Sequence, residues 1–196
     1  MLVQELWRHD YGWDDQIDAK HEKYWEAWFE GAKNIRHFKL DRCYNKGSGV
    51  SSIEMHIFGD ASETAYGTVA YLLFNFKTGD KKSILAMSKS KLAPIKTVTL
   101  PRLELNAAVL ATRLYRILIH EIDLPIERSY FWTDSIVTLQ YIRNETHRFK
   151  VYVANRVTEI LEVTNKDQWN YVSSKENPAD MVSRGCIRSS PVDERR

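Results

Sequence analysis

The strongest constraint on the fold is a change in the spacing of apolar residues near the middle of the chain. Upstream, apolar positions alternate along 53–60, aromatic and β-branched residues fill 65–76, and 82–90 continues as a third run. Polar turn residues, such as those of 77–80, separate these runs. Alternation over short segments predicts β-strands, and short turns between them predict an antiparallel meander.

Beyond Pro101 the apolar spacing becomes helical. Leucine and alanine recur at positions 103, 107, 110, 114 and 118, which predicts a helix over 101–121 with Pro101 in its first turn. We then expect strands at 128–133 and 168–172 and helices at 136–143, 149–163 and 177–184, the last with Asn177 as N-cap and Pro178 in its first turn. The order β-β-β-α-β-α-α-β-α predicts an α/β domain with a mixed five-stranded sheet flanked by helices.

A tryptophan-rich segment precedes the strands. Four of the six tryptophans lie in the first 28 residues, and the apolar positions from Ile17 to Ile35 have helical spacing. We expect these tryptophans to belong to a core, with the helix docked on the domain or on a missing neighbour. The organisation expected is a helical connection segment over 1–45, a linker over 46–52, an α/β domain over 53–185 and a loose tail over 186–196.

Composition excludes several classes of protein. The 196 residues are 43% hydrophobic and 28% charged with a net charge of +2, which is ordinary globular composition. No apolar run approaches the roughly 18 residues of a membrane span, and the N-terminal residues lack the pattern of a signal peptide. Cys43 and Cys186 have no partner spacing for zinc. We therefore expect a protein without membrane partners, in a reducing, intracellular and cytoplasmic setting.

Four acidic residues occupy special points of this scheme. Asp60 ends the first strand, Asp134 follows the fourth, and Glu104 and Asp180 lie in the first turns of two helices. Open α/β sheets place their sites at such strand ends. Carboxylates crowded there require cations, and oxygen ligands suit Mg²⁺ or Mn²⁺, of which two form the clamp used for phosphodiester displacement. Each acid also has a simpler explanation, because helix dipoles and turns favour acidic residues.

Five segments resemble the ribonuclease H domain of reverse-transcribing elements, and more narrowly that of BEL/Pao-type long-terminal-repeat retrotransposon polyproteins. They are IFGDAS (57–62), TLPRLELNAAVLATRL (99–114), FWTDSIVTLQYI (131–142), RFKVYVANRVTEI (148–160) and ENPADMVSRG (176–185). In addition, LWRHDYGWDD (6–15) and the Trp-rich helix resemble the segment that joins reverse transcriptase to ribonuclease H in those polyproteins.

The resemblance implies a ribonuclease-H-like fold in which Asp60, Glu104, Asp134 and Asp180 are catalytic and bind two Mg²⁺ or Mn²⁺ ions. Asp60 would bridge both ions, Glu104 and Asp134 would complete the ligation, and Asp180 would hold the more exposed ion. The implied activity is endonucleolytic cleavage of the RNA strand of RNA/DNA hybrids. The implied partners are the hybrid and the reverse transcriptase domain of the parent polyprotein, which can act inside a virus-like particle.

The sequence departs from the family in one respect. Many ribonuclease H domains have a histidine shortly before the last aspartate, whereas no histidine lies between Trp169 and Asp180 here. Two consequences of the missing histidine are open. Turnover is slower, or Lys175 or Glu176 takes over the role of the histidine. Polymerase, protease and integrase motifs are also absent, so we expect a fragment or derived relic of a polyprotein. The alternative function is a catalytically idle nucleic-acid-binding relic or a scaffold co-opted by the host; a DNA recombinase is a weaker third hypothesis.

A basic stretch lies next to the acids in sequence. Residues 77–102 contain seven lysines and arginines against one acid, Asp80. Such a stretch favours phosphate binding, although lysines also protect the edge strands of sheets from aggregation. The substrate-binding residues expected are Lys89, Lys91, Lys96, Arg102 and Ser135.

Overall fold

The computed structural model describes residues 2–37, 39, 49–146 and 148–184. The chain divides into two compact units, a larger one of Asn45–Arg184 and a smaller one of Met1–Tyr44 with Gly185–Arg196. The two cysteines, residues 46–48 of the expected linker and the expected tail over 186–196 lie outside the described residues.

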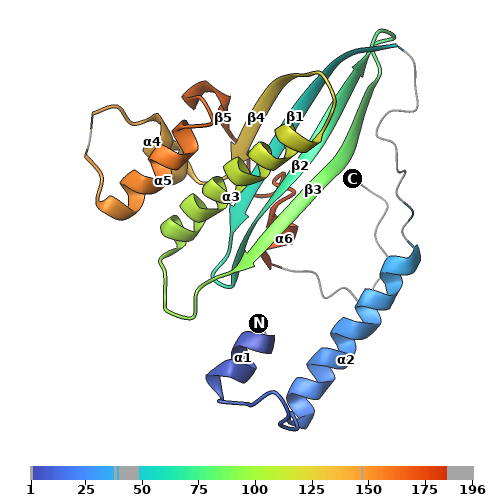
Figure 1. Cartoon of the computed structure of the whole chain (residues 1–196), viewed down its shortest axis with the longest axis vertical. Helices are drawn as coiled ribbons and strands as arrows, with labels where there is room; N and C mark the ends of the chain where they lie inside the picture. Colours follow the sequence, from blue (N-terminus) through green and yellow to red (C-terminus); the bar gives the residue numbers. More distant parts are fainter. Residues whose placement is uncertain (1, 38, 40–48, 147, 185–196) are drawn as a thin grey trace. The chain divides into compact units, whose positions relative to one another are not determined.

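The larger unit contains a five-stranded sheet (Figure 1). Its strands are β1 (Val50–Ala61), β2 (Ala65–Phe76), β3 (Lys81–Leu92), β4 (Ile126–Thr133) and β5 (Trp169–Tyr171), in the order β3-β2-β1-β4-β5. The first three strands form an antiparallel meander, whereas β4 runs parallel to β1 and β5 runs parallel to β4. The mixed sheet expected from the sequence is therefore confirmed.

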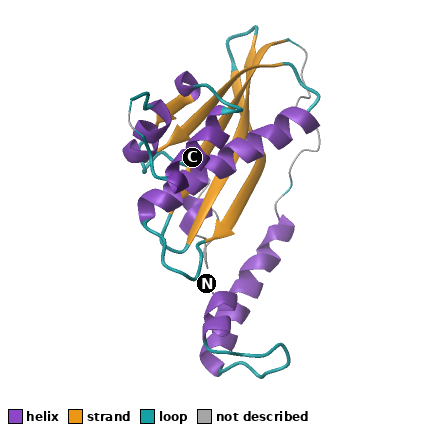
Figure 2. Cartoon of the chain, turned by 60° about the vertical axis from the view of Figure 1, so that its left-hand side comes forward, coloured by secondary structure: helices purple, strands orange, loops and turns teal. Residues whose placement is uncertain are grey.

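Helices cover this sheet (Figure 2). They are α3 (Leu100–Glu121), α4 (Ile136–Arg143), α5 (Val151–Leu161) and the short α6 (Asp180–Arg184). The long helix α3 packs on β1 and β2, and α4 and α5 pack against α3. The core between them buries the alternate β1 residues Met55 and Ile57 together with Leu105 and Leu114 of α3. Burial of such side chains stabilises the fold by about 1.5–3 kcal/mol each.

Among the element boundaries that differ from the sequence prediction, two lie in segments that support the site. Strand β1 begins at Val50, so three residues of the expected linker belong to the strand, and the Ser51 hydroxyl donates a 3.0 Å bond to the backbone oxygen of Asn75. A strand ladder is held by backbone groups, so polar residues extend it without an apolar signal. Helix α6 begins at Asp180 rather than after Asn177, which instead forms the turn before it.

Close packing at two glycines positions the helices on both faces of β1 and β2. A Cβ atom at Gly59 would lie 3.4 Å from the backbone oxygen of Ala107, so α3 approaches β1 at a residue without a side chain. A Cβ atom at Gly67 would lie 2.5 Å from Cγ1 of Val182 in α6. Gly67 pairs with Asp60, the residue after Gly59, and successive strand residues point to opposite faces. Helices α3 and α6 therefore contact opposite faces of the sheet near the end of β1.

The smaller unit contains α1 (Leu2–Arg8), α2 (Ala19–Lys33) and a 3₁₀ turn, η1 (Asn34–His37). Asp18 caps α2 by accepting bonds from the backbone N–H groups of Lys20 and His21. None of the described helices is both long and apolar enough to cross a membrane.

The N-terminal tryptophans do not form a core, which corrects the first of the two expectations and leaves the second, a helix docked on a missing neighbour, as a prediction. Their exposed fractions are 55% for Trp7, 88% for Trp13, 47% for Trp25 and 54% for Trp28. They pack on one another instead: the rings of Trp25 and Trp28 stack with centroids 5.1 Å apart, and Trp7 meets Trp13 edge-on at 5.8 Å. Helical spacing identifies an apolar face but not what covers it.

The approach of α6 to β2 makes Gly67 sensitive to substitution. Because Val182 has a stiff side chain, we expect Gly67→Ala to push α6 outward and to lower the free energy of unfolding by about 1–3 kcal/mol. Urea denaturation monitored by circular dichroism measures this loss. The double variant Gly67→Ala/Val182→Ala should recover part of it, because it removes the clashing methyl groups. Equal stability of Gly67→Ala and wild type would contradict this packing.

Candidate functional site

The parallel pairing of β1 and β4 brings two of the predicted acids to one edge of the sheet. Gly59 of β1 pairs with Thr133 of β4, and Asp60 and Asp134 are the residues that follow this pair. Because parallel strands run in the same direction, their carboxyl ends meet at the same edge. The two acids are thus neighbours through backbone register, although 73 residues of sequence separate them.

Glu104 reaches this edge from α3. Since α3 begins at Leu100, Glu104 lies in its second turn rather than in the first turn expected from the sequence. The Ser135 hydroxyl donates a 2.5 Å hydrogen bond to Oε2 of Glu104. Ser135 also caps α4, since its oxygen accepts a 3.1 Å bond from the backbone N–H of Thr138. Glu104 is therefore held by Ser135, the residue that follows Asp134.

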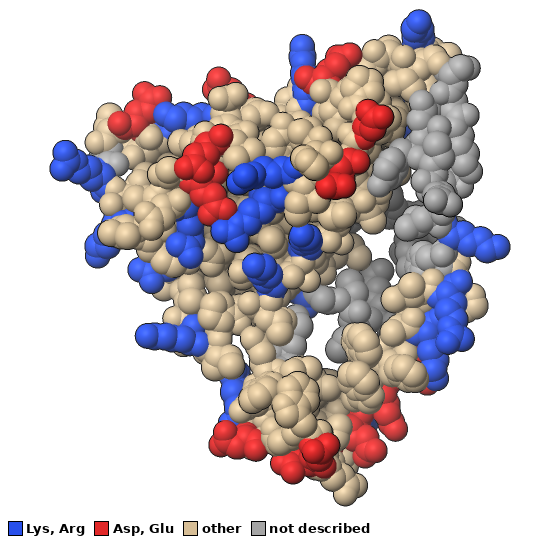
Figure 3. All heavy atoms as spheres, viewed as in Figure 1, with Lys and Arg blue, Asp and Glu red and all other residues tan. Residues whose placement is uncertain are grey.

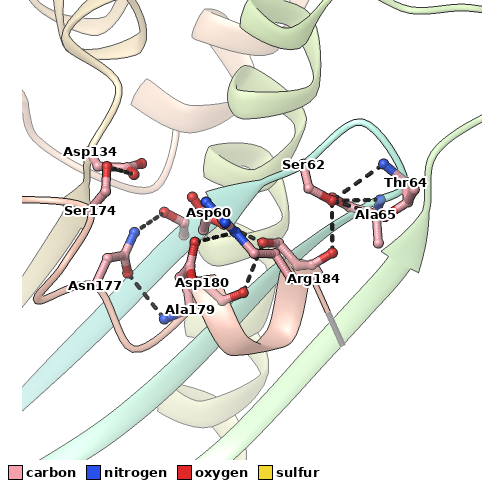
Figure 4. A network of polar contacts seen from close by, with 12 residues as sticks. Asp60, Ser62, Thr64, Ala65, Asp134, Ser174, Asn177, Ala179, Asp180 and Arg184 are labelled. Atoms are coloured by element: carbon pink, nitrogen blue, oxygen red, sulfur yellow. Dashed lines mark hydrogen bonds and ion pairs between the residues drawn. The ribbon is translucent and has the colours of Figure 1, made fainter. Parts of the chain in front are cut away.

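Asp180 is placed by the segment that leads into α6 (Figure 4). The buried Asn177 donates through Nδ2 to the backbone oxygen of Gly59 at 3.1 Å and accepts from the N–H of Ala179 at 3.1 Å. These bonds attach the start of α6 to the end of β1. The Asp180 carboxylate forms an exposed ion pair with Arg184, whose Nε lies 2.7 Å from Oδ1.

Asp60 is the most buried of the four acids, with an exposed fraction of 6%. Burial, which is the largest cause, and the nearby carboxylates of Asp134 and Asp180 together raise its pKa to about 6, against a hydrogen bond from Ser183 that lowers it. The Ser183 hydroxyl donates to Oδ2 of Asp60 from α6. Asp134 and Asp180 therefore each lie close enough to Asp60 to act on its charge.

The chemistry of this donor set fits a divalent cation. All four predicted ligands are carboxylates, which are the hard oxygen donors that Mg²⁺ and Mn²⁺ prefer, and their mutual repulsion would be relieved by a cation. In the described part of the chain, however, no three His, Cys, Asp or Glu side chains form a group arranged to hold a metal ion. Asp134 instead accepts a 2.6 Å hydrogen bond from the Ser174 hydroxyl, away from Asp60 (Figure 4).

The predicted basic contacts lie on the surface. Lys89 and Lys91 of β3, Lys96 of the following loop and Arg102 of α3 are all exposed. Lys and Arg side chains gather on the face that carries α3 (Figure 3). The Arg102 guanidinium lies over the Tyr152 ring, 4.8 Å from its centroid.

The fifth expected contact, Ser135, is placed differently. Its exposed fraction is 5%, and its hydroxyl is already used by Glu104 and Thr138. In this structure Ser135 therefore orients an acid, and its contact with substrate stays a prediction.

Several residues that arrange the acids were missed at the level of sequence. Ser183 follows Asp180 by three positions, which places both on one face of a helix, and this spacing was the only available signal. Ser174 lies in an irregular segment without any periodic pattern, and nothing in the sequence indicates its contact with Asp134. Both contacts depend on the return of the chain to the end of β1.

The buried Asp60 predicts a pH dependence of stability in the metal-free protein. Its folded pKa of about 6 lies above the ordinary value of 3.8, so the folded chain holds this proton more tightly than the unfolded chain. The Asp60 contribution to stability is then fully present below about pH 4 and is lost as the pH rises to about 6, by up to about 3 kcal/mol. Asp60→Asn should remove this loss.

We therefore expect Asp60→Asn to be more stable than wild type at pH 7.5 in EDTA, with the advantage shrinking towards pH 4. Denaturant unfolding of both proteins across this range measures the difference, in which the titration of all other groups largely cancels. A difference that does not change with pH would contradict the raised pKa of Asp60.

Solved structures similar to the chain include the N-terminal RNase H domain of a Mycobacterium tuberculosis protein (9% identity, TM-score 0.46, covering 67% of this chain and 90% of that one). They also include LC11-RNase H1, isolated from compost by a metagenomic approach and solved in complex with RNA/DNA hybrid (11% identity, TM-score 0.44, covering 69% of this chain and 96% of that one). A third is a foamy viral protease-reverse transcriptase in complex with double-stranded DNA (17% identity, TM-score 0.42, covering 90% of this chain and 34% of that one).

The sequence comparisons are more specific. A search of curated proteins finds no relative of this chain. The model of one family, described as the Pao retrotransposon-like RNaseH-like domain, matches residues 1–135, a span that includes Asp60, Glu104 and Asp134. With most of its length matched, the chain belongs to the family of Pao retrotransposon-like RNaseH-like domains.

Proposed function

We propose that this domain is a metal-dependent endonuclease that cleaves the RNA strand of RNA/DNA hybrids, as part of a BEL/Pao-type retrotransposon polyprotein. The observation that supports this most directly is that, within an RNaseH-like domain, Asp60 and Asp134 follow the last residue pair of β1 and β4. Ser135, the residue after Asp134, holds Glu104, and Asp180 acts electrostatically on Asp60. Acids are rarely grouped in this way for stability alone, since like charges at close range raise each other's pKa.

The chain's own residues would act as ligands and as supports for ligands. Asp60, the most buried of the four, would be the central ligand of two Mg²⁺ or Mn²⁺ ions, and Glu104, Asp134 and Asp180 would complete the ligand set. Two bound ions supply an activated water and stabilisation of the 3′-oxygen leaving group. Ser135 and Ser183 would keep Glu104 and Asp60 oriented through their hydrogen bonds.

The exposed basic residues are proposed to bind the hybrid by its phosphates. Lys89 and Lys91 alternate on β3, so both point to the same side of the edge strand. Such contacts provide affinity without reading the base sequence, and 2′-hydroxyl contacts would identify the RNA strand. This mode of binding suits an enzyme that acts on hybrids of any sequence.

A partner for the smaller unit is part of the same proposal. Tyr24, Trp25, Trp28 and Phe29 of α2 are each about half exposed, from 47% to 54%. Exposed aromatic patches of this kind mark protein contacts. We propose that α2 contacts the reverse transcriptase domain of the parent polyprotein, in the cytoplasm or in a virus-like particle.

The catalytic proposal is tested by Asp134→Asn. This change keeps the side-chain shape but removes one negative charge and a strong metal ligand. We expect cleavage of a labelled RNA/DNA hybrid in Mg²⁺ or Mn²⁺ to fall at least about a hundredfold, because metal-assisted stabilisation of the transition state supplies several kcal/mol. Hybrid binding should change little, since the lysines and arginines supply most of it.

Asp123→Asn is the matched control for this experiment. Asp123 is exposed and precedes β4, whereas Asp134 follows it, so the control removes an equal charge at the other end of the strand. Its cleavage should equal that of wild type. Cleavage unaffected by Asp134→Asn would refute the assignment. Salt-dependent binding by wild type without any cleavage would favour the idle nucleic-acid-binding domain.

The basic contacts are tested by the double variant Lys89→Ala/Lys91→Ala. If both lysines contact phosphates, hybrid affinity should fall. The plot of log K against log salt concentration should also become less steep, its slope losing up to about 1.8 in magnitude. Affinity measured by fluorescence anisotropy at several salt concentrations gives this slope. An unchanged slope together with increased aggregation would show that the lysines protect the edge of β3 instead.

A further inference from the structure

Each of the four acids has a hydrogen-bonding partner from the protein itself. Serine hydroxyls donate to three of them: Ser183 to Asp60, Ser135 to Glu104 and Ser174 to Asp134. Arg184 pairs with the fourth, Asp180. A carboxylate that accepts such a bond has one oxygen engaged, so these partners must either persist or leave when a cation binds.

Two of the partners are buried and fixed in place. Ser183 has no exposed surface; its N–H donates to the backbone oxygen of Ala179 at 3.0 Å, and its own backbone oxygen accepts from the Ser62 hydroxyl at 2.8 Å. Ser135 is similarly enclosed at the N-terminus of α4. Neither side chain can leave its acid without disturbing the helix that holds it.

The partner of Asp134 is different in kind. Ser174 is exposed and belongs to a turn between β5 and α6. Its hydroxyl lies 2.6 Å from Oδ2 of Asp134. Because no three acids of the described chain converge on one point, at least one of them must move before a cation is fully ligated. Asp134 can turn at low cost, since the side chain that holds it within the described part of the chain is an exposed hydroxyl.

We infer that the hydroxyl partners have two different roles. Ser183 and Ser135 are positioning residues that keep Asp60 and Glu104 oriented towards the cation. Ser174 instead competes with the cation, which must displace its hydroxyl from Asp134. This inference rests on the proposed function, since it concerns the same four acids. It assigns opposite effects to two serines that make the same kind of bond. A purely structural role for both would not produce this contrast.

The test is the affinity of the full chain for Mn²⁺ alone, measured by isothermal titration calorimetry without nucleic acid. Ser174→Ala should lower the dissociation constant about three- to tenfold, because the cation no longer competes with a hydrogen bond. Ser183→Ala should raise it about tenfold or more, because Asp60 loses the bond that orients it. Ser183→Thr retains a hydroxyl and should restore much of the affinity.

Two further variants make the comparison secure. Ser173→Ala removes a neighbouring hydroxyl that donates to Glu176 at 2.8 Å, so it controls for change in the turn and should leave affinity unaltered. Ser62→Ala removes the bond to the backbone oxygen of Ser183 but no bond to an acid, so it should also weaken Mn²⁺ binding. It therefore tests the same role if Ser183→Ala folds poorly. Thermal unfolding in EDTA reports the fold of each variant.

The outcomes separate this inference from the proposed function. Opposite shifts for Ser174→Ala and Ser183→Ala would support the division of roles. Shifts in the same direction, or none for Ser174→Ala, would overturn it while leaving the metal site in place. A wild-type chain that binds no Mn²⁺ at millimolar concentrations would overturn the metal-dependent function itself, and this inference with it.

Discussion

The parallel pairing of β1 with β4 is the constraint on which the site depends. With Gly59 opposite Thr133, Asp60 and Asp134 are the residues that follow the last pair between the two strands. A slip of one residue would turn every β1 side chain to the other face and take Met55 and Ile57 out of the core. The hydrophobic pattern therefore enforces the register, and the register places the acids. The closeness of α3 to Gly59 then brings Glu104 to the same edge.

Assembling these acids costs stability, and the surrounding hydrogen bonds offset part of that cost. Burial and two neighbouring carboxylates raise the pKa of Asp60, whereas Ser183 opposes the shift. A fold selected for stability alone would replace such a buried acid with an apolar or neutral residue. Retention of Asp60 in this setting is typical of residues kept for function, where stability and activity compete.

The last two elements of the domain, β5 and α6, are held in place by side-chain contacts with other elements more than by their own backbone hydrogen bonds. Strand β5 has three residues and α6 has five, and a helix this short is not stable in isolation. Asn177 attaches the segment to β1, Ser62 holds the carbonyl of Ser183, and Gly67 admits Val182. The position of Asp180 thus follows from a few specific contacts, so the exposed side of the site has the least rigid support.

The sequence by itself determined the meander, the long helix and the mixed sheet, and it singled out the four acids as candidate ligands. These features have local signatures, because apolar period, turn residues and strand ends are all encoded within a few positions. The start of α6 was less predictable, since Asn177 and Pro178 are typical of a helix N-terminus but serve here in a turn. The N-terminal helix was likewise identifiable, whereas the exposure of Trp25 and Trp28 was not.

Only the tertiary structure decided which group holds each acid. Ser183 meets Asp60 across 123 residues of sequence and Ser174 meets Asp134 across 40. A single hydroxyl has no periodicity, so its partner depends on the path by which the chain returns to the sheet edge. The difference between the buried Ser183 and the exposed Ser174 also exists only in three dimensions. Local patterns therefore identified the acids, and long-range packing determined how each of them is held.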